Sequence, residues 1–237
     1  MNQPIYMQIA EQLRSNIQQA TYQAGEKLPT EMQLAERFGV NRHTVRNAIA
    51  LLKDEGLVRV DRGRGTFVAA TPIKYAIGKR VRYNENLKAQ GIDASYKTIR
   101  TLEMPADVAI AKALKIDIGA EVVLIERLGL ANDRPISIAS SYFPVELFPN
   151  LIGVWQNYDS VSKLAREVYH YDHIRHSTSI SARIVQEADA RLLEVPLNHP
   201  ILLTESVNVN EEAVAIEYGV TRFSGEMMEM VISMNDE

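Results

Sequence analysis

The sequence predicts an α+β protein with two domains, a small helical N-terminal domain and a larger C-terminal domain built on an antiparallel sheet. Apolar residues recur at helical spacing from Ile5 to about Glu55, which indicates short helices, and a strand pattern follows them. Beyond about residue 96, apolar and β-branched blocks alternate with turn residues, which is typical of antiparallel strands. A length of 237 residues accommodates one or two domains of about 100–200 residues.

The composition excludes several classes of protein. The chain has no cysteine, which rules out disulfide frameworks, thiolate zinc sites and cysteine nucleophiles. A hydrophobic content of 46% is enough for ordinary buried cores rather than disorder. The N-terminal segment lacks the pattern of a signal peptide, and no uncharged apolar run approaches the ~18 residues of a membrane span. We therefore expect a cytoplasmic protein with no membrane partner.

The net charge of −4 is unevenly distributed along the chain. Residues 1–70 contain nine basic and seven acidic side chains, whereas residues 71–237 contain 17 basic and 23 acidic ones. The basic excess falls between Arg42 and Arg64, where six basic residues outnumber three acidic ones. Such a local patch is sufficient to meet the phosphates of a nucleic acid despite the negative total.

Three helices are expected before residue 56, each with a recognisable beginning or end. The first carries one apolar stripe that starts at Ile5, and it is expected to run to about Tyr22. Thr30 is the expected N-cap of the second helix, and Gly39 suits the position just after its end. Asn41 is the expected N-cap of the third helix, which runs to about Glu55.

The third helix has two faces with different predicted roles. Apolar residues at i, i+3, i+4 and i+7, from Val45 to Leu52, should face the core. Near its N-terminal end, four residues point away from the core: Arg42, His43, Arg46 and Asn47. In a helix-turn-helix, residues at this place meet base edges in the major groove, where arginine reads guanine O6 and N7 bidentately.

A basic, glycine-rich turn follows the helices. Residues 57–60 and 66–68 have the pattern of two strands, and Arg62-Gly63-Arg64-Gly65 connects them. We expect this hairpin to be a wing that lies along a groove of DNA, which makes residues 1–70 a winged helix-turn-helix domain. A generic three-helix bundle with a hairpin is the alternative that periodicity alone leaves open.

Short motifs span nearly all of residues 5–69. They are Gly25-x-x-Leu28-Pro29-Thr30-Glu31, Leu34-Ala35-x-x-Phe38, Arg42-x-Thr44-Val45-Arg46, Glu55-Gly56-Leu57 and Gly63-x-Gly65-Thr66-Phe67-Val68. With these motifs the segment resembles the DNA-binding domain of the GntR family of bacterial transcription regulators. The resemblance implies a symmetric homodimer that contacts operator DNA through Arg42, Thr44, Arg46 and Gly65. Met32 departs from the family, since many members carry arginine there.

The composition changes at Ala69-Ala70-Thr71-Pro72, a small and polar stretch with a proline. We therefore expect a linker at residues 71–77 and a second domain at residues 78–237. Within the second domain, a short helix, a strand, a turn and a strand occur twice, with turns at residues 132–133 and 210–211. This weak repeat predicts two similar units that pack about a pseudo-twofold axis, with a cleft between them.

A second set of motifs lies in residues 78–235. They are Glu126-Arg127-Leu128, Pro135-Ile136, Tyr142-Phe143-Pro144, Phe148-Pro149-x-Leu151 and Ala215-Ile216-Glu217-Tyr218. They resemble the UTRA domain, the chorismate-lyase-like effector domain of the HutC branch of the GntR family. The segments 79–87, 41–44 and 180–183 resemble regulators of phosphonate-utilisation genes within that branch.

A small anionic effector is the expected ligand of the second domain. A phosphonate or phosphate ester needs arginines, hydroxyls and backbone amides around its oxygens. Arg127 lies on the strand that contacts the ligand in the resembling proteins, and Ser160 begins a helix whose amides suit an anion. The other candidates, for which salt bridging is the alternative, are Arg82, Arg183, Glu217 and Arg222. Gly129 and Ala139 replace polar residues of sugar-phosphate sensors, which argues against a sugar phosphate.

Other functions have less support in the sequence. His170, His173 and His176 have a spacing that could ligate zinc, but their neighbours do not indicate a metal site, and we expect neither a metal nor a cofactor. An enzyme is the main rival, yet no nucleophile elbow, phosphate loop or metal motif occurs, so no catalytic residue is assigned. A purely architectural DNA-binding protein would gain nothing from an acidic second domain.

These observations predict a transcription regulator that binds double-stranded operator DNA as a homodimer. We expect a small-molecule effector of phosphonate metabolism to bind in the second domain and to control the affinity for the operator. Urocanate and sugar phosphates are the alternative effectors. Repression relieved by the ligand is the commoner arrangement among the resembling proteins, and we expect it here.

Overall fold

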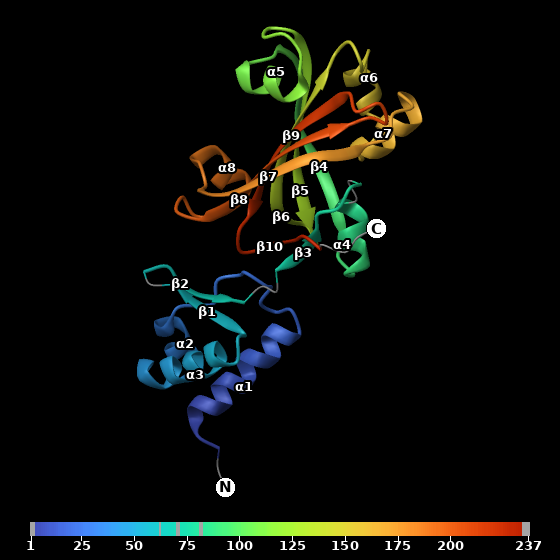
Figure 1. Cartoon of the computed structure of the whole chain (residues 1–237). Helices are drawn as coiled ribbons and strands as arrows, with labels where there is room; N and C mark the ends of the chain where they lie inside the picture. Colours follow the sequence, from blue (N-terminus) through green and yellow to red (C-terminus); the bar gives the residue numbers. More distant parts are fainter. Residues whose placement is uncertain (1–2, 62, 70–71, 81–82, 234–237) are drawn as a thin grey trace. The chain divides into compact units, whose positions relative to one another are not determined.

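A computed structural model of the chain describes residues 3–61, 63–69, 72–80 and 83–233 (Figure 1). The chain divides into two compact units, residues 1–71 and residues 72–237. Each unit has hydrophobic clusters of its own.

The first unit consists of three helices and a hairpin. Its elements are α1 (Ile5–Gln18), α2 (Glu31–Phe38), α3 (Arg42–Asp54), β1 (Val58–Asp61) and β2 (Gly65–Val68). The two strands are antiparallel, with Val58 opposite Val68 and Asp61 opposite Gly65. The arrangement confirms the predicted winged helix-turn-helix, although α1 ends earlier than expected.

Side-chain caps fix the turn between α2 and α3. Thr30 Oγ1 accepts a hydrogen bond from the backbone N–H of Gln33, and Gln33 Oε1 accepts one from the backbone N–H of Thr30, which forms a capping box. Gly39 ends α2 in the left-handed conformation, with a φ of 62°. Asn41 Oδ1 then accepts from the backbone N–H of Thr44 at 2.9 Å and starts α3. The caps predicted at Thr30 and Asn41 are confirmed.

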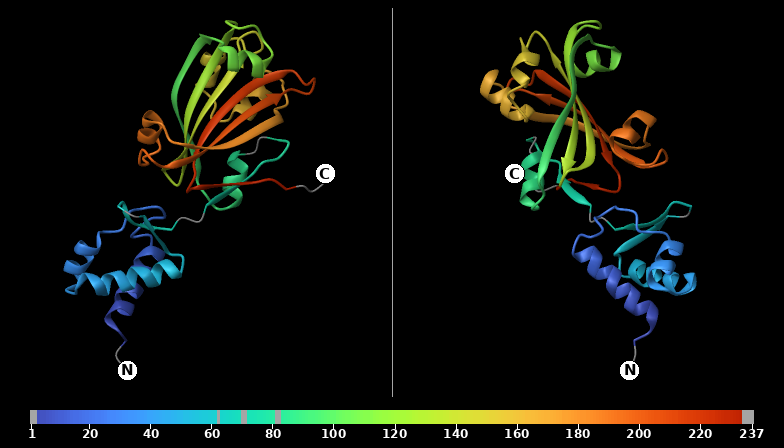
Figure 2. Two further views of the ribbon diagram at one scale, coloured as in Figure 1. Left: turned by 60° about the vertical axis from the view of Figure 1, so that its left-hand side comes forward. Right: turned by 180° about the vertical axis from the view of Figure 1, so that it is seen from behind.

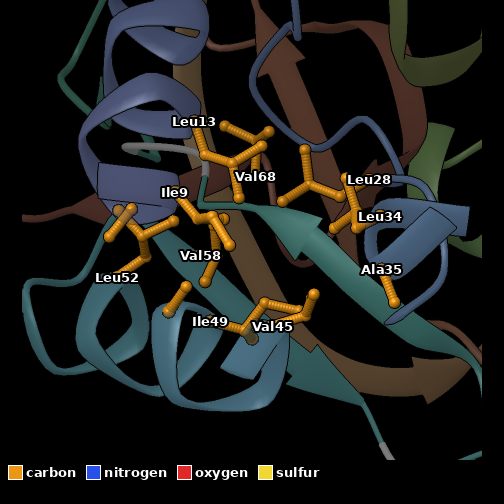
Figure 3. Close-up of a cluster of buried hydrophobic side chains, with 12 residues drawn as sticks. Ile9, Leu13, Leu28, Leu34, Ala35, Val45, Ile49, Leu52, Val58 and Val68 are labelled. Carbon is orange, nitrogen blue, oxygen red and sulfur yellow. The ribbon is translucent and has the colours of Figure 1, made fainter. Parts of the chain in front are cut away.

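The core of the first unit draws on every element, as Figure 3 shows. Ile9 and Leu13 of α1 pack with Leu34 of α2 and with the apolar face of α3. Leu52 of α3 has no exposed surface. Burial of this face fixes the rotation of α3 about its axis, so the polar face is turned to solvent.

The second unit is built on a six-stranded antiparallel sheet in the order β4-β5-β6-β9-β8-β7. The strands are β4 (Ala94–Pro105), β5 (Glu121–Ala131), β6 (Arg134–Pro144), β7 (Ile174–Ile184), β8 (Pro200–Val209) and β9 (Ala215–Ser224). Strands β4, β5 and β6 form one half and β7, β8 and β9 the other, and the halves meet where β6 pairs with β9. This order matches the repeat that the sequence predicted.

Helices cover both faces of the sheet (Figures 1 and 2). One face carries α5 (Val108–Leu114) and α8 (Glu187–Leu192), which follow the first strand of each half. The other face carries α4 (Tyr83–Ala89), α6 (Leu151–Trp155) and α7 (Val161–Val168). No helix in the described ranges is long and apolar enough to cross a membrane.

The linker expected at residues 71–77 is corrected for Ile73–Ala76, which form strand β3. This strand pairs in parallel with β10 (Met228–Val231). Ile73 and Tyr75 alternate with exposed residues and join a buried cluster with Phe223 and Met228. Because this burial ties the segment to the second unit, it is structured rather than a spacer. Sequence analysis also missed the short helices α4 and α6.

Leu52→Ala is expected to destabilise the first unit by about 2–5 kcal/mol, because it leaves a cavity at a fully buried position. The single tryptophan of the chain, Trp155, lies in the second unit and should not respond. Urea denaturation of the full chain, followed by circular dichroism and by Trp155 fluorescence, separates the two effects. A fluorescence midpoint that moves together with the first dichroism transition would contradict independent units.

Candidate functional site

The N-terminal half of α3 presents a polar surface opposite its buried face. Four of the predicted DNA-contacting residues are exposed there: Arg42, His43, Arg46 and Asn47. Thr44 is half-buried, and its hydroxyl donates to Asn41 Oδ1 at 3.0 Å, so it is part of the helix cap. The structure therefore brings the predicted residues of α3 together on one side of the helix.

Glu31 of α2 holds the arginines of this surface, a role that sequence analysis missed. Arg46 donates to its carboxylate through Nε at 3.1 Å and Nη2 at 2.8 Å, and Arg42 lies 3.9 Å away. The hydrogen bond from Arg46 and the nearby positive charges lower the pKa of Glu31. Since Glu31 follows the N-cap of α2 and the pair joins the two helices, the guanidinium of Arg46 is positioned before any DNA arrives.

The turn between β1 and β2 contains Arg64 and Gly65, and the backbone of Gly65 lies close to the side chain of Lys27. Gly65 has a φ of 117°, and a Cβ there would lie 2.7 Å from Cε of Lys27. The guanidinium of Arg64 lies 3.5 Å from the carboxylate of Asp61. Arg62, which the sequence also assigned to the wing, lies outside the described residues. Lys27 adds a positive charge at the wing that sequence analysis did not assign.

A cavity of about 350 Å³ lies between the sheet of the second unit and helices α4 and α7. Its sheet side carries mainly small and hydroxyl-bearing side chains of β6, β8 and β9: Ser137, Ala139, Ser141, Thr204, Ser206, Gly219 and Thr221. Among the described lining residues, the basic ones other than histidine are Arg127, Lys163, Arg166 and Arg175. The acidic ones are Glu85, Asp159 and Glu217.

Arg127 of β5 is a buried cation on this cavity, with 8% of its surface exposed. Its guanidinium carbon lies 4.7 Å from the ring centroid of Tyr96 and 5.4 Å from that of Trp155. Within the described part of the chain it makes no hydrogen bond or ion pair, and its buried Nε has no acceptor. Cation–π contacts of about 0.5–2 kcal/mol each offset only part of the several kcal/mol that burial of an ion costs. An anion in the cavity would offset the rest of the cost of burying the charge of Arg127.

The first turn of α7 lies at the same cavity. Ser160 is its N-cap, and its hydroxyl accepts from the backbone N–H of Lys163 at 3.3 Å. The cap directs the start of α7 toward the cavity, where Lys163 and Arg166 also line the wall. The structure thus places Ser160 and Arg127 on one cavity, together with the basic residues Lys163 and Arg166.

Glu217 of β9 also lines the cavity, but its carboxylate is already bonded. Its Oε2 lies 2.6 Å from His173 Nε2 and accepts from Asn208 Nδ2 at 2.6 Å. Burial raises the pKa of Glu217, but attraction to His173 and hydrogen bonds from His173, Ser141 and Asn208 prevail and lower it to about 2. His173 Nδ1 is in turn 2.7 Å from the hydroxyl of Ser162. Glu217 therefore organises its neighbours as an ionised group.

Two predicted effector residues do not line the cavity. Arg222 points to the opposite face of the sheet, where it meets Glu126 at 3.3 Å and Asp189 at 3.4 Å. The alternation of β9 explains this, because its neighbours on either side face the cavity. Arg183 is exposed on the edge strand β7 and donates to the carbonyl of Ala182. Arg222 therefore forms salt bridges, which was the alternative to an effector contact. Arg82 lies outside the described residues.

The histidine triplet does not come together. Of His170, His173 and His176, only His173 lines the cavity. In the described ranges, no three side chains of metal-binding type gather at one place.

Arg175 of β7 is a cavity residue that sequence analysis missed. Its Nη2 donates to the hydroxyl of Tyr75 at 2.8 Å, and its Nη1 donates to the carbonyl of Gly78 at 2.9 Å. Tyr75 belongs to β3, which was expected to be a linker. The alternation of Ile73 and Tyr75 was the signal that could have revealed it.

Comparison with known proteins identifies both units. The model of the bacterial regulatory proteins of the gntR family matches residues 5–68, and the UTRA domain model matches residues 89–229. An uncharacterized HTH-type transcriptional regulator of Rhizobium meliloti is 34% identical over 98% of this chain and 96% of its own length. The chain belongs to the GntR family of transcription regulators, with a UTRA domain. The predicted family and the α+β fold class are confirmed.

Further relatives of this GntR-family regulator agree. The probable transcriptional regulator PhnF of Escherichia coli is 33% identical over 96% of the chain and 94% of its own length. The crystal structure of PhnF from Mycobacterium smegmatis is similar with a TM-score of 0.69 and 27% identity, and covers 97% of this chain and 100% of that one. The GntR-family regulator is thus a DNA-binding protein whose UTRA domain places it under ligand control.

Glu217→Gln should make the second unit less stable at neutral pH than the wild type. The pKa of Glu217 falls from an ordinary 4.5 to about 2 on folding. Ionisation therefore contributes on the order of 3 kcal/mol at pH 7, which is lost as pH falls from about 4.5 to about 2. Urea denaturation followed by Trp155 fluorescence at pH 7, 5, 4 and 3 measures the difference between the two proteins. A difference that stays constant below pH 5 would contradict the assignment.

Proposed function

We propose that this regulator represses its target genes by binding operator DNA, and that a small anionic effector in the cavity weakens this binding. Arg127 carries the proposal, because it is a buried cation on a ligand-sized cavity with aromatic rings in place of a carboxylate. A soluble anion that pairs with Arg127 would form charge-assisted hydrogen bonds with it, and these bonds would contribute strongly to the free energy of effector binding. The cytoplasm is the compartment where such a regulator meets both DNA and metabolites.

We assign operator contacts to α3 and to the wing. On α3 the proposed residues are Arg42, His43, Thr44, Arg46 and Asn47, and on the wing they are Arg64, Gly65 and the undescribed Arg62. The exposed polar side of α3 supports the first group, and the close backbone approach at Gly65 supports the second. The domain boundary proposed near residue 71 leaves all of these residues in the first unit.

The proposed effector is a phosphonate or a phosphate ester. The start of α7 and Arg127 offer backbone amides, hydroxyls and a guanidinium, which are the groups that tetrahedral oxyanions require. A sugar phosphate is a poorer candidate. At Gly129, where sugar-phosphate sensors carry a second basic residue, a Cβ would lie 2.3 Å from Ser137 Oγ and 3.3 Å from Tyr96.

Catalysis is a second candidate, because Ser162, His173 and Glu217 are hydrogen-bonded in the order nucleophile, base and acid. We infer binding without turnover, in keeping with a family of regulators. Incubation with p-nitrophenyl acetate and p-nitrophenyl phosphate distinguishes the two. Product release that Ser162→Ala abolishes would establish an enzyme, whereas thermal stabilisation by phosphonates without product supports a sensor.

Arg42→Ala and Arg46→Ala should each weaken operator binding by about 1–3 kcal/mol, because each removes a bidentate contact to a base. Fluorescence anisotropy with labelled operator measures the loss, and circular dichroism checks folding. Arg183→Ala removes the same charge from the second unit and serves as the matched control. Wild-type affinity in both folded α3 variants would refute the assignment.

A homodimer on an inverted repeat is expected, because one recognition helix supplies few base contacts and a twofold axis doubles them. The edge strands β4 and β7 leave backbone N–H and C=O groups without a partner strand. We therefore expect the second unit to provide much of the dimer interface. Sedimentation equilibrium at micromolar concentration, with and without operator, tests this. A monomer under both conditions is the outcome that rules the dimer out.

Arg127→Ala should keep operator affinity but lose the response to the effector, since the two sites lie in different units. A thermal-shift screen of phosphonates, phosphate esters, urocanate and sugar phosphates finds the effector, because a hundredfold excess over Kd stabilises by about 2.7 kcal/mol. Titration of the operator complex then measures the response, with Arg183→Ala as control. By linkage, operator DNA must weaken effector binding by the same factor. A variant that responds like the wild type makes Arg127 a structural residue.

A further inference from the structure

We propose that the cavity has a second anionic subsite at Arg175, so that the effector carries two anionic groups. One group is held by Arg127 and the other by Arg175. The inference rests on the proposed function for the first of these groups and adds the class of ligand: a phosphonate or phosphate ester with a second acidic group.

The two guanidiniums lie at the ends of a row of three tyrosine rings. Arg127 lies over Tyr96, the ring centroids of Tyr96 and Tyr83 are 5.8 Å apart, and those of Tyr83 and Tyr75 are 5.1 Å apart. The guanidinium of Arg175 closes the row 5.8 Å from the Tyr75 centroid. All five side chains line the cavity, so both cations belong to the wall that one bound ligand would meet.

The side of the Arg175 guanidinium that is formed by Nε and Nη2 holds no carboxylate in the described residues. Its Nη2 donates to the hydroxyl of Tyr75, whereas its Nε is buried and has no acceptor in the described residues. Nε and Nη2 form the side of a guanidinium that holds a carboxylate bidentately. Three arginines of the described residues hold a carboxylate by that side: Arg14, Arg46 and Arg59.

No carboxylate in the described ranges forms an ion pair with Arg175. Glu217 is bonded to His173 and Asn208, and Asp172 pairs with Arg80 at 2.6 Å. Among the described residues, the positive charge of Arg175 is therefore met by the dipoles of a hydroxyl and a carbonyl and by the ring of Tyr75, but by no carboxylate. Because Nε has no solvent-accessible surface, a ligand carboxylate would have to displace the hydroxyl of Tyr75 from Nη2 to bind this side of the guanidinium, where it would accept charge-assisted hydrogen bonds.

Occupation of this subsite also acts on the start of the second unit. Tyr75 belongs to β3, the first strand after the boundary between the units, and Arg175 binds both Tyr75 and Gly78. An anion that takes Nη2 loosens the bond to Tyr75. The second anionic group is thus the part of the effector that reaches the chain leading to the DNA-binding unit.

The test uses matched pairs of ligands that differ only in a terminal carboxylate or methyl group. The pairs are phosphonoacetate with ethylphosphonate, 3-phosphonopropionate with propylphosphonate, and 4-phosphonobutyrate with butylphosphonate. Calorimetric titration of the full-length wild type should give at least one pair in which the carboxylate binds about tenfold tighter, or about 1.4 kcal/mol. Arg175→Gln and Arg175→Lys should remove this ratio while the alkylphosphonate affinity stays the same.

Arg183→Gln on the same strand removes one charge away from the cavity and should keep the ratio. Hydrogen exchange at residues 73–79 should change with the carboxylate ligand and remain unchanged with its alkyl partner. Equal affinity within every pair, or a ratio that survives both Arg175 variants, would overturn the second subsite and leave the first intact. If none of the six compounds binds the wild type, the phosphonate site at Arg127 fails as well.

Discussion

A guanidinium buried among aromatic rings is the constraint on which the second unit depends. Arg127 has no carboxylate partner in the described residues, so Tyr96 and Trp155 must lie against its faces. Gly129, two residues further along β5, leaves the space that the ring of Tyr96 needs. A side chain at Gly129 would displace Ser137 and Tyr96 together. The arrangement keeps a positive charge between aromatic rings on the wall of the cavity.

The two-fold construction of the sheet explains why a cavity exists at all. Each half places a helix, α5 or α8, on the same face of the sheet, so that face is filled. On the other face α4 and α7 belong to connections of unequal length and leave a gap above β6 and β9. The side chains there are small or hydroxylated, which gives volume and hydrogen-bonding groups at once.

Strand periodicity and turn residues made most of the fold predictable. The hairpin turn at Asn132 and Asp133 has positive φ at both residues, which suits this pair of residue types, so its position could be read directly. Arg127 and Ser160 were found because their motif and cap positions are local. Arg175 was not, since its partner Tyr75 is one hundred residues away and only the packing of β3 brings them together. Arg222 was misplaced, although it lies an odd number of residues from Glu217 and strand alternation therefore puts the two side chains on opposite faces of β9.

Glu31 has a consequence for how the regulator searches a genome. Non-specific binding to DNA comes from counterions released when basic side chains meet phosphates, with a slope of about −0.9 per contact. A carboxylate that already holds Arg46 and lies near Arg42 reduces the charge available for such contacts. On the proposed assignment of Arg42 and Arg46 to operator contacts, random sequence would be held less tightly, and operator bases would compete with Glu31 for the guanidiniums. Glu31 would therefore shorten the residence time on non-operator DNA and leave a larger fraction of the protein free to bind the operator.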